Sequence, residues 1–113
     1  MKITIEELEA YLQGLYAGRV SDQSLFMKLV EELGETAEVL NKISGRKQAD
    51  EVDLKAQLGN ELADMIHYVM AIAAVNGLDM NEIILEKDKR ASLKYGRENN
   101  IEQFVLQKRE ANK

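Results

Sequence analysis

Apolar residues recur at helical spacing along most of the chain. At about 100° per residue, one face of residues 22–43 carries Leu25, Leu29, Leu33, Ala37 and Leu40. One face of residues 53–76 carries Leu58, Leu62, Met65, Ile66, Val69 and Ala73. The two matched faces predict a pair of long helices that pack antiparallel against each other and build the core.

Start and stop signals predict two further helices, over about residues 5–17 and 79–95. Thr4 with Glu7 has the pattern of a capping box, and Asp79 with Glu82 has the same pattern with Asp as the cap. Glycines that follow the predicted helices are expected to end them. They are Gly18, Gly45, Gly77 and Gly96, although Gly14 offers an earlier end to the first helix.

The remaining segments are polar connections and a tail. Residues 45–53 are charged and too short for a domain linker, so they are predicted to form a loop. In the tail, residues 97–113, Ile101, Phe104 and Val105 would form an apolar stripe on a short helix that docks on this chain or on a partner. We therefore expect one all-α domain over residues 1–113, bundle-like, with its core at about 22–96.

Composition agrees with helices and limits the chemistry. The 113 residues include no proline and no cysteine, and there is one histidine, His67. These counts exclude disulfides, thiol nucleophiles and zinc sites built from thiolates or several histidines of one chain. A metal site here needs oxygen ligands.

Charge and hydropathy argue against two classes of partner. The net charge of −5 has the wrong sign for binding a phosphate backbone, so nucleic acid is not expected. The longest apolar stretch, residues 69–75, is far shorter than the roughly 20 residues of a membrane-spanning helix. The first residues do not resemble a secretory signal, so we expect a cytoplasmic protein.

Two pairs of carboxylates lie at the edges of the two long apolar faces. Glu32 borders the first face and Glu35 follows three residues later, while Glu61 and Asp64 repeat this arrangement on the second helix. When the faces pack, the four carboxylates converge at the border between core and solvent. Their repulsion would be relieved by a hard divalent cation with oxygen ligands, Mg²⁺ or Mn²⁺.

Either pair by itself is weak support for a metal site, because acidic residues three apart on a helix usually form a solvated surface. Two pairs on neighbouring helices, each at the edge of an apolar face, favour the metal site. They do not identify the substrate.

Two segments carry a family resemblance. Residues 28–35, KLVEELGE, and 61–64, ELAD, resemble the EExxE and ExxD signature of MazG-like pyrophosphohydrolases, with 25 residues between Glu35 and Glu61. Residues 58–66 resemble the family's second metal helix. Gly77-Leu78-Asp79, which opens a helix with Lys87 and Arg90, resembles its third conserved segment. The likeness extends over about residues 25–95.

This resemblance implies hydrolysis of a (deoxy)nucleoside triphosphate to the monophosphate and pyrophosphate with Mg²⁺, for which Mn²⁺ is a substitute. It implies that Glu32, Glu35, Glu61 and Asp64 are the metal ligands and the catalytic residues. Because the chain has one copy of the motif and about four helices, it also implies a homodimer or homotetramer that completes the nucleotide cleft.

Further residues have second-rank roles. Lys87, Arg90 and Lys94 share roughly one helical face and are candidate phosphate contacts. On a helical wheel Glu31 is expected to point away from the four carboxylates, and Glu38 extends the acidic face. The other candidates are bases near the phosphates and aromatics for the nucleobase: Lys42, Arg46, Lys47, Tyr68 and Tyr95. His67 faces away from Glu61 and is expected to be structural.

Two other functions remain open. One is a pyrophosphohydrolase with a related substrate, such as phosphoribosyl-ATP. The other is a non-catalytic helical module that binds nucleotides or mediates oligomerisation.

Overall fold

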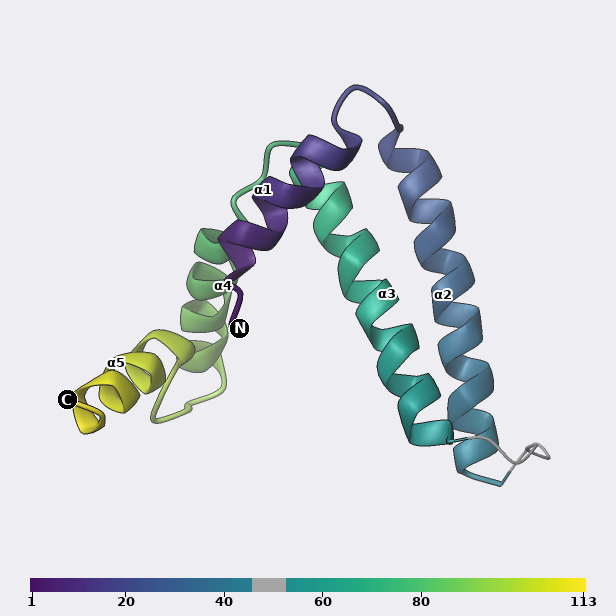
Figure 1. Cartoon of the computed structure of the whole chain (residues 1–113). Coiled ribbons are helices and arrows are strands. Elements are labelled where there is room, and N and C mark those ends of the chain that lie inside the picture. Colours follow the sequence, from purple (N-terminus) through teal and green to yellow (C-terminus); the bar gives the residue numbers. More distant parts are fainter. Residues whose placement is uncertain (46–52) are drawn as a thin grey trace. The chain divides into compact units, whose positions relative to one another are not determined.

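The structure is a computed structural model that describes residues 1–45 and 53–113. These residues form helices and no strand, so the predicted all-α fold is confirmed. The helices are α1 (Ile5–Tyr16), α2 (Asp22–Ile43), α3 (Leu54–Val75), α4 (Met80–Lys94) and α5 (Ile101–Ala111) (Figure 1). They fall into two compact units, Met1–Leu78 and Asp79–Lys113, which we describe separately.

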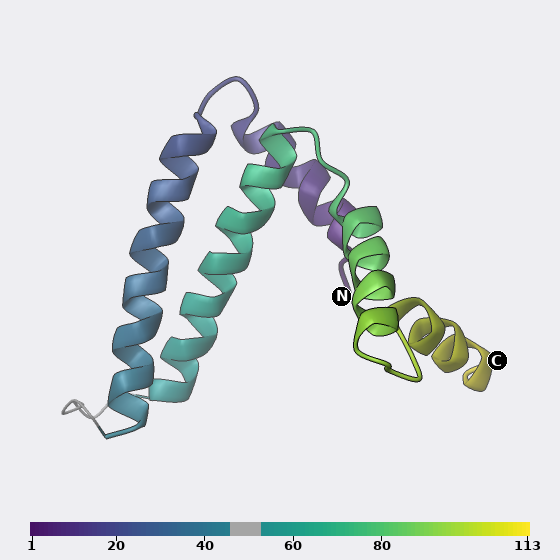
Figure 2. The same ribbon diagram turned by 180° about the vertical axis from the view of Figure 1, so that it is seen from behind.

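In the first unit, α2 and α3 form an antiparallel hairpin, as predicted. They lie side by side over most of their length in both views (Figures 1 and 2). At the end of the hairpin near Gly77, α1 packs against α3. The fully buried Leu12 of α1 belongs to this core, as do Leu25 of α2 and Ala71 of α3. The small alanines of α3 allow α1 to approach closely.

The prediction of the core face was wrong for part of the hairpin. On α2 the buried residues are Leu25, Thr36 and Val39, whereas Leu33 and Leu40 are 47% and 48% exposed. On α3 the apolar residues that remain exposed are Leu62, Ile66 and Val69. The apolar stripe of each helix is wider than the contact between two helices, so one edge of each stripe stays outside.

Thr36 takes a core position because its hydroxyl is satisfied locally. The hydroxyl donates to the backbone carbonyl of Glu32 at 2.7 Å and lies 3.2 Å from Sδ of Met65 on α3. A hydroxyl that bonds to the carbonyl four residues back can be buried at little cost. Thr36 therefore lines the α2–α3 contact one helical turn after Glu32.

The helix ends follow the predicted signals. Thr4 and Glu7 form a complete capping box, and Asp79 caps α4 by accepting a hydrogen bond from the backbone N–H of Glu82. Gly77 adopts a φ of +66° after α3, a conformation that other residues rarely adopt. Gly14 lies inside α1, so the earlier end that it offered is not used.

A hydrogen bond and ring contacts join α1 to α3. The Tyr16 hydroxyl and Nε2 of His67 are 2.7 Å apart, and their rings meet edge to face. His67 also meets Tyr68 edge to face. These contacts give His67 the structural role that we expected, and burial raises the pKa of Tyr16.

The second unit consists of α4 and α5, and the tail contains the predicted short helix. Asp88 of α4 accepts a hydrogen bond from the backbone N–H of Ile101 at 2.7 Å, which fixes the start of α5. The buried Ser92 hydroxyl donates to the carbonyl of Asn99 at 3.0 Å. Phe104 stays more than half exposed, so the apolar stripe of the tail is incompletely covered within this unit.

Within the described part of the chain, no single helix has the length and hydropathy to cross a membrane.

Candidate metal centre

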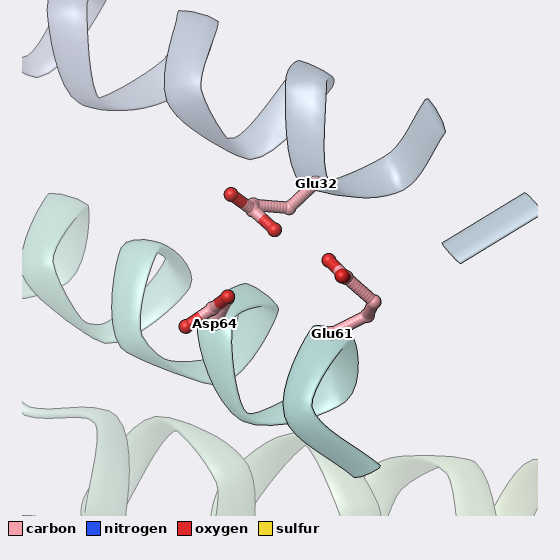
Figure 3. Close-up of side chains that lie close together, drawn as sticks. All are labelled: Glu32, Glu61 and Asp64. Carbon is pink, nitrogen blue, oxygen red and sulfur yellow. The ribbon is translucent and has the colours of Figure 1, made fainter. Parts of the chain in front are cut away.

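Three of the four predicted carboxylates meet between α2 and α3. One oxygen from each of Glu32, Glu61 and Asp64 lies within 4.8 Å of the others. Figure 3 shows Glu32 reaching from α2 toward the two acidic side chains of α3. The antiparallel packing of the hairpin brings these residues together across 29 to 32 positions of sequence.

The cluster is partly withdrawn from water. Oε2 of Glu32 and Oε2 of Glu61 are buried, and neither has a hydrogen-bond partner in residues 1–45 and 53–113. The adjacent Glu32 carboxylate, burial and the proximity of Glu35 raise the pKa of Glu61 from 4.5 to about 7. In the absence of a cation, these crowded carboxylates therefore hold a proton to higher pH than an isolated glutamate does.

These residues fit a hard divalent cation. All three offer carboxylate oxygens, which Mg²⁺ and Mn²⁺ prefer as ligands. Two buried oxygens without a donor would gain a positive partner, and like charges that now compete for a proton would be neutralised. Asp64 is exposed, which leaves one side of the cluster open to a substrate.

Glu35 lies at the margin of this cluster. Its side chain is exposed, and it is close enough to raise the pKa of Glu61 by hydrogen bonding and by charge. It is not among the three residues that converge within 4.8 Å. The structure thus brings together Glu32, Glu61 and Asp64 tightly and places Glu35 beside Glu61.

A groove of about 560 Å³ runs beside the cluster along the hairpin. Its α2 wall consists of Glu31, Gly34, Glu35, Glu38 and Val39. Its α3 wall consists of Gln57, Asn60 and Glu61. Glu31 lines the same groove as Glu35 and Glu61, so the expectation that it points away from them was wrong. On α2 it lies one turn before Glu35 and hence on nearly the same face.

The sequence interpretation also missed Gln57 and Asn60. Both lie on the α3 wall, one turn apart and within one turn of Glu61. Their placement on the Asp64 side of the helical wheel is visible in the sequence. Neutral amides, however, give no charge pattern that distinguishes them from ordinary surface residues.

The predicted basic and aromatic contacts are carried by several elements of the chain. Lys87, Arg90 and Lys94 are exposed on α4 of the second unit. There Tyr95 is 65% exposed, with the Lys94 ammonium 5.4 Å from its ring centroid. Lys42 is half-buried near the end of α2. Arg46 and Lys47 lie outside the described residues. Tyr68 contacts His67 and is half-buried in the first unit.

Comparison with known proteins identifies the family. Residues 20–92 match the MazG nucleotide pyrophosphohydrolase domain, which is well over half of the chain. The chain belongs to this MazG family. The matched segment contains all four predicted carboxylates and extends from the start of α2 into α4, whereas α1 and α5 lie outside it.

A solved MazG structure supports the fold. The chain is similar to iMazG from Vibrio DAT 722, with a TM-score of 0.64 and 26% sequence identity over 84% of this chain and 100% of that one. No curated protein matches the sequence significantly. The MazG family assignment therefore rests on the domain match and on this structure.

Proposed function

We propose that this MazG protein hydrolyses a (deoxy)nucleoside triphosphate to the monophosphate and pyrophosphate, with Mg²⁺ or Mn²⁺ as cofactor. The observation that carries the proposal is the meeting of Glu32, Glu61 and Asp64 within 4.8 Å beside an open groove. Membership of the MazG family supplies the reaction class.

Four carboxylates would hold the cation. Glu32, Glu61 and Asp64 supply the converging oxygens, and Glu35 adds a fourth carboxylate from the groove wall. A bound divalent cation would neutralise these anions, draw in the phosphates and make the attacking water more acidic. Oε2 of Glu32 and Oε2 of Glu61 are buried where α2 and α3 pack together, so the proposed metal site lies between the two helices.

The attacking group is water, since the chain contains no thiol and no serine or histidine lines the groove among the described residues. Glu35 is exposed beside Glu61, so one of its oxygens can orient the water and accept its proton. A leaving pyrophosphate also needs positive charge, for which the sequence offers Lys87, Arg90 and Lys94 as candidates. These bases lie about one turn apart and form one cationic stripe.

The hairpin also has the surface for assembly with a second copy. Leu33, Leu62 and Ile66 are about half exposed. On a helical wheel they point away from the residues that line the groove. Exposed apolar surface on both helices of a hairpin suits a second hairpin, because two such pairs pack as a four-helix arrangement around a two-fold axis. We therefore assign the homodimer contact, within a dimer or a tetramer, to this face.

The reaction is tested by product analysis over a panel of nucleotides with Mg²⁺, including phosphoribosyl-ATP. Monophosphate and pyrophosphate are expected. An α–β methylene analogue should resist cleavage, while a β–γ methylene analogue should be cut and release methylene bisphosphonate. Nucleoside diphosphate with orthophosphate from a pure sample would contradict the proposal, and so would the absence of turnover on every substrate.

A further inference from the structure

The two walls of the groove differ in charge. The α2 wall carries three carboxylates, Glu31, Glu35 and Glu38, whereas the α3 wall carries the neutral amides Gln57 and Asn60 before Glu61. Glu31 forms an exposed ion pair with Lys28 at 3.5 Å. No basic residue lines the groove among the residues that the structure describes. A phosphate chain would be repelled along this surface except where a cation bridges it to the carboxylates.

This charge pattern orients a bound nucleotide. Its phosphates belong at the cluster, near Glu61 and Asp64, because only there can a cation compensate the repulsion. Gln57 lies one turn before Glu61, about 6 Å along the helix axis. The sugar and base extend from the α-phosphate over a comparable length and are uncharged. The part of the groove beside Gln57 is therefore suited to the nucleoside.

The α3 wall contributes two amide side chains, Gln57 and Asn60. Gln57 is half-buried and Asn60 is exposed, and neither side chain makes a hydrogen bond with residues 1–45 or 53–113. A carboxamide presents one acceptor and two donors side by side. This arrangement matches the paired donor and acceptor on the edge of a base, as in the pairing of Asn or Gln with adenine.

We propose that Gln57 and Asn60 are specificity-determining residues that hydrogen-bond to the nucleobase in the groove. The inference rests on the proposed function and adds to it a preference among nucleobases. Carboxylates accept hydrogen bonds from exocyclic amino groups, and the opposite wall is rich in carboxylates. The amides would hold the edge of the base so that its exocyclic group faces these carboxylates. The carboxylates would accept from the amino group of adenine or cytosine and repel the O4 carbonyl of uracil or thymine, so the groove favours the amino bases.

Calorimetry with uncleaved analogues tests this directly. The probes are the α–β methylene triphosphates of adenosine, cytidine and uridine in the presence of Mg²⁺. Wild type should bind the adenosine or cytidine analogue about tenfold or more tightly than the uridine analogue. Gln57→Met and Asn60→Leu keep the side-chain size and should each reduce that preference severalfold. Gln13→Leu, an exposed amide on α1, is the matched control.

Mn²⁺ binding and the melting temperature distinguish recognition of the base from a role in metal binding or in stability. Both should stay unchanged in the two variants, because neither amide supplies one of the converging oxygens and the substitutions keep the side-chain size. Equal loss for all analogues together with weaker Mn²⁺ binding would assign the amides to the metal site and overturn the inference. Unchanged preference in both variants, or a wild type without preference, would also overturn it.

The failure of the proposed function would look different. A folded wild type that binds none of the three analogues with Mg²⁺ would remove the nucleotide reaction and the inference together. A wild type that releases pyrophosphate from all triphosphates at equal rates would remove the inference alone.

Discussion

The two faces of the α2–α3 hairpin differ in what they place at the surface. On the groove face, carboxylates from both helices converge, and two buried oxygens have no hydrogen-bond partner in the described part of the chain. On the opposite face, apolar side chains such as Leu33 and Ile66 are about half exposed. The like charges on one face and the exposed apolar surface on the other both disfavour folding of the isolated chain. The first would be relieved by binding a cation, and the second by contact with a second copy of the chain.

The residues proposed to act in catalysis and assembly therefore differ from the residues that hold the hairpin together. The part of the hairpin that is buried within the chain, around Leu25, Thr36 and Val39, is a narrow line between the two faces. Changes on the groove face should therefore alter catalysis with little loss of stability, and changes on the apolar face should alter assembly. The predictions below test this separation.

The largest effect is expected from neutralising the groove face. Glu61→Gln and Glu32→Gln keep the side-chain shape and remove a negative charge, so metal-dependent turnover should fall by more than about 100-fold. In chelator, the melting temperature should hold or rise because repulsion is relieved. Steady-state kinetics and thermal melts measure both quantities.

Glu98→Gln is the control for these variants. Glu98 is exposed in the connection between α4 and α5 and should tolerate the change without loss of turnover. Turnover that survives in both Glu61→Gln and Glu32→Gln would reduce the cluster to a solvated acidic surface. A large fall in melting temperature would indicate a structural ion pair instead.

A smaller effect is expected from placing charge on the apolar face. Ile66 is 57% exposed in the chain, so Ile66→Glu should leave the hairpin folded. It should weaken self-association by at least about 30-fold, which corresponds to about 2 kcal/mol for a central interface residue. Light scattering over a range of concentrations measures this.

Leu93→Glu provides the comparison, because Leu93 is an exposed apolar residue of the second unit and is not among the residues assigned to the interface. A wild type that is already monomeric would contradict the assembly, and so would an Ile66→Glu variant that dimerises as well as wild type.

The pH dependence of stability is a further way to distinguish the faces. The pKa of Glu61 is raised from 4.5 to about 7, so the folded state holds a proton that the unfolded state has already lost. Stability of the metal-free protein should be greatest below pH 4.5 on this account and should fall as pH rises toward and through about 7. Urea unfolding in chelator at several pH values measures it.

In Glu61→Gln this part of the pH dependence should be lost, whereas Ile66→Glu should retain it. A cation competes with the same proton, so added Mg²⁺ should stabilise wild type more at about pH 8 than at about pH 6. Identical pH profiles for wild type and Glu61→Gln would show that Glu61 does not carry a shifted proton.

The smallest effect is expected from Gly34 on the groove wall. It lies inside α2, and a Cβ there would meet no atom within 4 Å. Gly34→Ala should stabilise the first unit by up to about 1 kcal/mol through helix propensity. Gly77→Ala should do the opposite, since Gly77 has a φ of +66°. Chemical unfolding of both variants compares them, and a destabilised Gly34→Ala would indicate a close contact at this position.

Local rules predicted the helices well because their ends depend on nearby residues. Thr4 and Glu7, Asp79, and the glycines with positive φ act within one turn of chain. The face that each long helix buries was harder to predict. Hydropathy favoured Leu33 and Leu40, whereas the structure buries Thr36, whose hydroxyl is satisfied within its own helix.

The acidic residues of the candidate site could be predicted from the sequence, whereas its neutral residues could not. Glu32, Glu61 and Asp64 were expected to converge, and they do, because the edges of two apolar stripes meet when helices pack. Gln57 and Asn60 were missed since an amide on a helix surface carries no charge pattern. Glu31 was expected to point away from the other carboxylates, but it lines the same groove as Glu35 and Glu61.

The most direct test of the central claim is Mn²⁺ binding followed by electron paramagnetic resonance in wild type and Glu61→Gln, with Glu98→Gln as control. We expect saturable binding to wild type and to the control, and binding at least about tenfold weaker in Glu61→Gln. Equal binding by all three proteins, or no binding by wild type, would contradict the claim that Glu32, Glu61 and Asp64 form a metal centre.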